Sequence, residues 1–117
     1  MGDFRKLLVW KKAKDLAVKI YQLTEKQTLS KDYGFKDQIQ RASVSISANI
    51  AEGDELGTDK QSIRHFYIAK GSSAELQTLL IIGNEIGYFE KEYADSLINE
   101  GKVISFMLAK LIKARMK

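Results

Sequence analysis

The chain has 117 residues, of which 44% are hydrophobic and 29% charged, and its formal net charge is +4. This length and composition predict one globular domain, residues 1–117, with a hydrophobic core large enough to be stable without covalent cross-links. Cysteine is absent, which excludes disulfides, thiolate metal sites and a cysteine nucleophile. Proline is absent as well, so long uninterrupted helices are permitted.

The chain carries no pattern typical of targeting or membrane insertion. Its first six residues lack the apolar run of a signal peptide. The longest apolar run, residues 79–82, is far too short to cross a bilayer. We therefore expect a cytoplasmic protein that does not enter membranes.

Apolar residues recur at spacings of three and four in four segments, which predicts four helices at about residues 4–26, 35–52, 59–86 and 90–115. Thr58 followed by Gln61 is typical of a capping box at the start of the third helix. Gly53 and Gly87 are expected to end the second and third helices. No segment of useful length alternates like a strand. Short links favour antiparallel neighbours, so the prediction is an all-α, antiparallel up-down-up-down four-helix bundle.

The second predicted helix combines small and polar residues on one face. The small residues are Ala42, Ser45, Ala48 and Ala51. The polar residues are Gln38, Arg41, Asn49 and Glu52. A buried polar group without a partner costs about 1–3 kcal/mol, so we expect this helix in the middle of the bundle, with its polar groups answered by neighbouring helices. If the second and third helices fold back on each other about residue 56, Arg41 lies near Glu75, and we expect the two to form a structural ion pair. Asn49 then lies near residues 63–66.

The same stretch resembles the signature of the 23S rRNA intervening-sequence proteins, also called the S23 family. The matching residues of the second helix are Arg41-Ala42, Val44-Ser45-Ile46 and Asn49-Ile50-Ala51-Glu52-Gly53. Further matches are Trp10-Lys11-Lys12-Ala13 through Tyr21, Tyr33-Gly34, Gln38-Ile39, Phe66, Ala69, Gly71-Ser72, Glu75-Leu76 and Gly87-Tyr88. The resemblance implies a four-helix bundle with a link to ribosomal RNA intervening sequences. Related proteins form five-subunit rings, and one relative is the accessory variability determinant of diversity-generating retroelements, which binds a reverse transcriptase and nucleic acid.

Catalytic and metal sites are not indicated by the sequence. His65 is the only histidine, so neither a zinc site nor the paired Glu-x-x-His motifs of di-iron bundles can be built, and a surface or interface role is expected for it. Serines 43, 45, 47, 72 and 73 lie inside predicted helices, where packing is their usual role. The segment Gly71-Ser72-Ser73-Ala74 is interpreted as a close contact between the third helix and the small residues of the second. We predict no enzymatic activity, no metal and no cofactor.

Positive charge gathers near both ends of the sequence. Residues 1–15 hold five basic and two acidic side chains, and residues 102–117 hold five basic and no acidic ones. In an up-down bundle these segments share one end, where they can attract phosphates without recognising sequence. The candidate phosphate contacts are Lys11, Lys12, Lys14, Lys110, Lys113 and Arg115. The alternative is a solvated polar face.

Asp54 and Glu55 stand where the family commonly has a basic element, in what we predict to be the loop after the second helix. An acidic loop beside a basic end favours pairing across a subunit boundary. Apolar residues off the main stripes also predict self-association. On the first helix they are Leu8, Val9, Leu16, Val18 and Tyr21, and on the third they are Tyr67, Ile68, Leu79, Ile81 and Ile82.

The functional prediction is a non-enzymatic, homo-oligomeric scaffold or binding protein. The resemblance implies a pentameric ring, while the residue pattern indicates only surplus apolar surface. The basic end is the candidate surface for RNA or DNA. The competing interpretation is a protein–protein adaptor that touches no nucleic acid.

Overall fold

The computed structural model describes residues 3–26, 29, 31–56 and 58–116 of the chain. Within them lie a short 3-10 helix, η1 (Phe4–Lys6), and the helices α1 (Leu8–Leu23), α3 (Tyr33–Glu55), α4 (Asp59–Glu85) and α5 (Lys91–Arg115). These described ranges contain no strand. The predicted all-α class is therefore confirmed.

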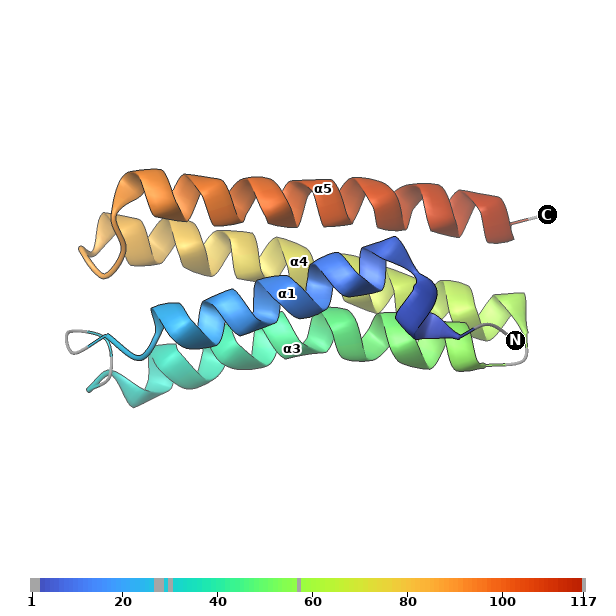
Figure 1. Ribbon diagram of the computed structural model, residues 1–117, viewed down its shortest axis with the longest axis horizontal. Helices are drawn as coiled ribbons and strands as arrows, with labels where there is room; N and C mark the ends of the chain where they lie inside the picture. The colour runs from blue at the N-terminus through green and yellow to red at the C-terminus, as the bar shows by residue number, and fades with distance from the viewer. Residues whose placement is uncertain (1–2, 27–28, 30, 57, 117) are drawn as a thin grey trace.

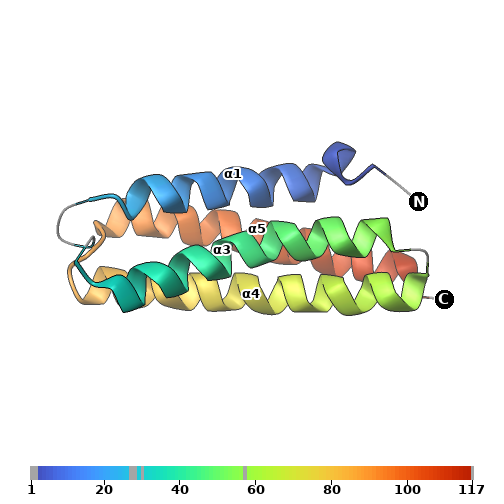
Figure 2. The ribbon, with the colours of Figure 1, turned by 90° about the horizontal axis from the view of Figure 1, so that it is seen from below.

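The four helices pack side by side in an elongated body of about 46 × 20 × 20 Å. Contacts join α1 to α3, α3 to α4, α4 to α5 and α5 back to α1, so each helix occupies one corner of a square. Consecutive helices run in opposite directions, and both chain termini lie at the same end of the bundle (Figures 1 and 2). The predicted up-down-up-down bundle is confirmed, but α3 is no more central than its neighbours.

The first predicted helix is divided in two. The carboxylate of Asp3 accepts a hydrogen bond from the Arg5 amide and caps η1, and Leu7 then adopts an extended backbone (φ −72°, ψ 124°). Helix α1 consequently begins at Leu8 rather than Phe4. Val9 and Leu16, which we expected to contribute to surplus apolar surface, lie in the core instead.

Gly53 does not end the second predicted helix, because α3 continues to Glu55. Its role is in packing. A Cβ atom at this position would lie 2.7 Å from Cε1 of Phe66, well inside van der Waals contact. The glycine therefore lets the ring of Phe66, which is fully buried, lie directly against the backbone of α3.

The ends of α4 follow the predicted signals. Thr58 is the N-cap, and its hydroxyl oxygen accepts a hydrogen bond from the Gln61 amide at 3.3 Å. At the other end Gly87 has φ 84°, a conformation that glycine adopts without strain. The Gly87 amide donates to the Asn84 carbonyl and the Tyr88 amide to the Gly83 carbonyl, which is the Schellman pattern.

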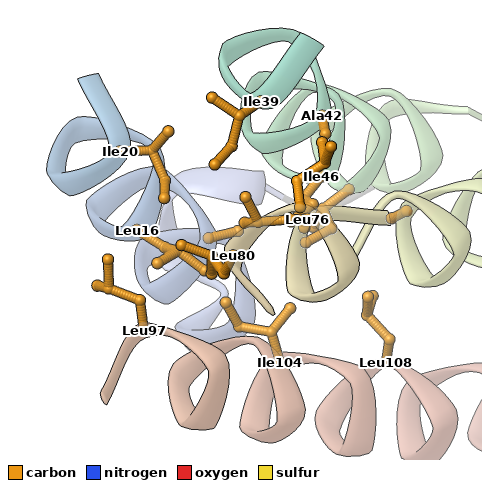
Figure 3. Close-up of a cluster of buried hydrophobic side chains, with 14 of the residues drawn as sticks. Leu16, Ile20, Ile39, Ala42, Ile46, Leu76, Leu80, Leu97, Ile104 and Leu108 are labelled. Atoms are coloured by element: carbon orange, nitrogen blue, oxygen red, sulfur yellow. The ribbon is translucent and has the colours of Figure 1, made fainter. Parts of the chain in front are cut away.

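All four α-helices contribute to one hydrophobic core (Figure 3). Its central side chains are fully buried leucines and isoleucines, drawn from α1 (Leu16, Ile20), α3 (Ile39, Ile46), α4 (Leu76, Leu80) and α5 (Leu97, Ile104, Leu108). Burying each such side chain contributes about 1.5–3 kcal/mol relative to exposure. Leu79 also belongs to this core, which corrects its assignment as a surface residue.

Candidate nucleic-acid interface

The six basic residues predicted to contact phosphate come from α1 and α5, which adjoin one another in the bundle. The five lysines are exposed, and Arg115 is half-buried. Lys19 Nζ donates to Glu100 Oε2 at 2.9 Å, which fixes the register of the two antiparallel helices. Eight residues from this pair toward the end that holds the termini, Lys11 on α1 lies level with Leu108 on α5. At a rise of 1.5 Å per residue, Lys110 lies about 3 Å farther along the axis. The lysines of the two helices therefore lie at similar heights.

The six residues differ in whether a carboxylate already neutralises them. Lys14 Nζ contacts Asp15 Oδ1 at 2.7 Å, and this hydrogen bond lowers the pKa of Asp15. In the part of the chain that the structure describes, no carboxylate forms an ion pair with Lys11, Lys12, Lys110 or Lys113. Lys12 lines an open groove of about 500 Å³ between α1 and α5, beside Asp15. Four lysines thus remain available to an anionic ligand.

Arg115 has a structural partner. Its guanidinium lies 3.2 Å from Oδ1 of Asp54 and 5.4 Å from the ring centroid of Phe66. Asp54 is only 5% exposed, and no described residue donates a hydrogen bond to its second oxygen, Oδ2. Arg115 therefore compensates a buried charge and joins α5 to α3, so the prediction that it serves phosphate binding is not supported by its contacts.

The same contact corrects the interpretation of the acidic segment. Asp54 and Glu55 belong to the last turn of α3 rather than to a loop, and Asp54 pairs within the chain rather than across a subunit boundary. Periodicity failed to predict this because the helix was expected to stop at Gly53. Glu55 and Asp59 are exposed beside this turn.

A feature that the sequence prediction missed lies on α5. Phe106 is 62% exposed, and Nζ of Lys110 is 4.9 Å from the centroid of its ring. Lys102 and Lys113 are exposed on the same helix. The signal was present in the spacing, since residues 102, 106 and 110 repeat every four positions in a segment without acidic residues. Lys117 lies outside the described residues.

Only one of the predicted interhelix polar residues makes a contact between helices. Asn49 Oδ1 is 3.0 Å from Nδ1 of His65 on α4, in agreement with the predicted register, and Asn49 Nδ2 donates to the Ser45 carbonyl at 2.9 Å. The side chains of the other four residues are exposed: Gln38, Arg41, Glu52 and Glu75.

The predicted ion pair between Arg41 and Glu75 is not formed. Arg41 Nε lies 3.9 Å from Asp37 Oδ2, one turn earlier on α3. Arg41 and Glu75 do line one shallow groove between α3 and α4, so the register was right. Both side chains can reach water there, and water removes the need for a direct partner.

Short polar side chains make the contacts between α3 and α4 that the longer ones do not. Ser45 and Ser72 join their hydroxyl oxygens at 2.8 Å, and Ser62 Oγ donates to the Gly53 carbonyl at 2.6 Å. The Asn49–His65 contact continues this row. Within the predicted contact segment 71–74, Ser72 therefore does contact α3, whereas Gly71 is exposed and an added Cβ there would meet no atom within 4 Å.

No cluster of three or more histidine, cysteine, aspartate or glutamate side chains with metal-site geometry occurs among residues 3–26, 29, 31–56 and 58–116. Over the same ranges, no helix combines the length and hydropathy needed to cross a membrane.

Apolar side chains remain exposed along the outside of α4. They include Tyr67, Ile68, Ile81 and Ile82, and Ile86 at the C-cap of the helix. On α1 the exposed set is Leu8, Val18 and Tyr21. This confirms part of the apolar surplus expected from the sequence.

Comparison with known proteins agrees with the architecture. Residues 5–110 match the sequence profile of the family described as 23S rRNA-intervening sequence protein. A crystal structure of a protein of unknown function from the S23 ribosomal protein family of Bacteroides thetaiotaomicron is similar to the chain, with a TM-score of 0.83 and 27% identity. That similarity covers 91% of this chain and 99% of the other. No curated protein gives a significant match. The chain belongs to the 23S rRNA-intervening sequence protein family.

Proposed function

We propose that this protein is a non-enzymatic, homo-oligomeric binding protein that contacts RNA or DNA phosphates through lysines of α1 and α5. The observation that supports this best is the group of four exposed lysines without an ion-pair partner among the described residues, Lys11, Lys12, Lys110 and Lys113. They come from two adjoining helices at the end that holds both termini. Lysines in this arrangement attract phosphate by releasing condensed counterions, without recognising base sequence.

Self-association would repeat this surface in every copy, although one copy alone binds weakly. The apolar side chains exposed on α4 supply area for a contact between copies, and a cyclic arrangement repeats the same lysines around the ring axis. A pentamer, as the family resemblance implies, would present twenty of these lysines to one polymer. Repeated weak contacts on one polymer raise the overall affinity through effective concentration.

Salt dependence tests the phosphate contacts. Four contacts predict a slope of about −3 in a plot of log affinity against log salt, from about −0.7 to −0.9 per phosphate. The triple variant K11E/K12E/K113E should lose most affinity and flatten this slope. K26E/K31E/K91E is the matched control, because it changes the net charge equally but at the opposite end of the bundle. Equal affinity of both variants would refute the proposed surface.

The second candidate function is a protein–protein adaptor, and the apolar outer side of α4 favours it. Tyr67 is 54% exposed there, beside Ile68. An apolar interface responds weakly to salt, because its free energy comes from buried area rather than from counterions. Partner binding that persists in high salt and in K11E/K12E/K113E, together with no affinity for RNA or DNA, would favour the adaptor.

Light scattering on a sizing column tests the oligomer. A pentamer has five times the chain mass of 13.3 kDa. A species of this mass at both low and high salt supports an apolar contact between copies. A monomer at both salts refutes self-association, and a pentamer that dissociates in salt indicates that charges hold the copies together.

A further inference from the structure

The outer side of α5 carries an aromatic ring surrounded by positive charge. Phe106 is 62% exposed, more than any other phenylalanine of the described residues. With 3.6 residues per turn, residues 102, 106, 110 and 113 fall within about a quarter of the helix circumference. Along the axis they span about 16 Å. Lys102, Lys110 and Lys113 therefore surround the ring on one strip of surface, which we call the Phe106 strip.

The charges of the Phe106 strip are not neutralised within the chain. No carboxylate of the described residues forms an ion pair with Lys102, Lys110 or Lys113. The ammonium of Lys110 instead lies 4.9 Å from the ring centroid, within the range of a cation–π contact. A single exposed apolar side chain is unremarkable in a globular protein. An exposed ring among three unpaired cations is a combination suited to a ligand that has both a flat face and negative charge.

We propose that the Phe106 strip binds single-stranded nucleic acid, with a base stacked on Phe106 and the flanking phosphates beside Lys102, Lys110 and Lys113. This inference rests on the proposed function and deepens it by naming the form of nucleic acid. Aromatic side chains stack on any unpaired base, so the contact tolerates any sequence. In a duplex the base faces are covered by neighbouring pairs, which leaves only the lysine contacts. The protein therefore prefers single strands to duplexes of the same length.

The surrounding charge favours nucleic acid over a second copy of the chain as the occupant. A contact that joins this strip on two copies would bring three lysines against three, and like charges at short range repel. A head-to-tail contact, as in a ring, would instead have to cover the three cations with carboxylates of the neighbouring copy. The exposed side chains of α4 that we assign to self-association lie on another helix. Both surfaces can therefore be occupied at once.

Fluorescence anisotropy with labelled oligonucleotides of about 16 nucleotides, the upper end of common site sizes, tests the proposal. The probes are oligo-dT, oligo-U and a DNA duplex of equal length. Phe106→Ala should weaken binding of both single strands by about 5- to 150-fold, the range for one stacked base, and leave duplex binding unchanged. The salt slope should stay the same, because every phosphate contact remains. Phe106→Trp should restore binding, since indole also stacks.

The matched control is Tyr33→Ala, which removes an exposed ring from the first turn of α3, away from both the lysines and the apolar side of α4. Its affinity for single strands should equal that of the unchanged protein. If Phe106→Ala binds single strands as tightly as Tyr33→Ala while K11E/K12E/K113E has lost binding, stacking is refuted and the proposed function stands. If no probe binds the unchanged protein, both are refuted. If Phe106→Ala lowers the mass seen by light scattering, the ring belongs to a contact between copies and the stacking proposal is overturned.

Discussion

The two ends of the bundle are closed by similar parts. At the end that holds the termini, the ring of Phe66 lies on Gly53, and Arg115 pairs with Asp54. At the opposite end the rings of Phe35 and Phe89 enclose Gly83, where an added Cβ would lie 2.5 Å from Cδ2 of Phe89. In each case an aromatic ring packs on a glycine inside a helix. Beside the ring lies a polar contact between two residues that are far apart in the sequence.

The polar contacts differ in charge and burial. At the opposite end the Tyr88 hydroxyl donates to Asp32 Oδ2 at 2.5 Å, and Asp32 also caps α3 by accepting from the Phe35 amide. Both side chains are half-buried, and water can share in their hydrogen bonding. Asp54 is nearly inaccessible and depends on one partner. The ring on glycine therefore sets the packing at both ends, while the end with the termini also relies on an ion pair to a buried carboxylate.

The largest effect is expected from Arg115→Met, which removes that partner. A buried carboxylate left without compensation typically costs about 3–5 kcal/mol, and we expect about 3 kcal/mol because Arg115 itself is 27% exposed. Urea unfolding followed by circular dichroism measures the change. The double variant D54N/R115M should recover part of the loss, because it removes the uncompensated charge. Equal stability of Arg115→Met and the unchanged protein would show that the two ends do not differ.

Intermediate effects are expected from placing alanine at the ring-accepting glycines. Gly53→Ala and Gly83→Ala gain up to about 1 kcal/mol of helix propensity but overpack their rings, at a cost of about 1–3 kcal/mol. We expect both to destabilise, Gly83→Ala more, because its Cβ would approach two rings. Gly71→Ala is the control, since an added Cβ meets nothing within 4 Å, and it should stabilise by about 0.5–1 kcal/mol. Thermal unfolding of the three variants separates the gain in helix propensity from the cost of overpacking.

The smallest effect is expected from Tyr88→Phe, and it appears as a change in pH dependence. The hydrogen bond from Tyr88 is the main cause of the lowered pKa of Asp32. A carboxylate with a lowered folded-state pKa contributes stability above its ordinary value of 3.8, and that contribution is lost as the pH falls through the folded-state pKa. Tyr88→Phe should reduce this acid dependence, measured as urea midpoints between neutral pH and pH about 2. An unchanged acid profile would contradict the assignment.

The fold was largely predictable because hydrophobic periodicity and turn signals agree along the chain. Gly87 has no competing role, so its effect as a helix end could be read from the sequence. The prediction that Gly53 ends the second helix was wrong, because a glycine near a helix end can serve either as a stop or as a site of close packing. Only the position of Phe66 in three dimensions distinguishes the two roles.

The candidate site was predictable in part. Charge counting located the basic end and five exposed lysines, but it could not show that Arg115 is engaged by Asp54, since this pair joins residues 61 positions apart. It also overlooked Phe106, because a count of charges does not register an aromatic ring between them. The long polar side chains of α3 were assigned inward because they flank its small-residue face, whereas serine and asparagine make the interhelix contacts.

The Asp54–Arg115 contact has a consequence for synthesis on the ribosome. Helices α1, α3 and α4 can pair with their neighbours in the order in which they emerge, because those contacts join adjacent segments. Asp54 emerges 61 residues before Arg115, and at about 5–20 residues per second this interval lasts several seconds. Until Arg115 emerges, the Asp54 carboxylate lacks the partner that compensates it in the folded protein, so we expect its burial and the docking of the last turn of α3 to be disfavoured. The nascent chain therefore completes this end of the bundle only when the last turn of α5 has left the exit tunnel.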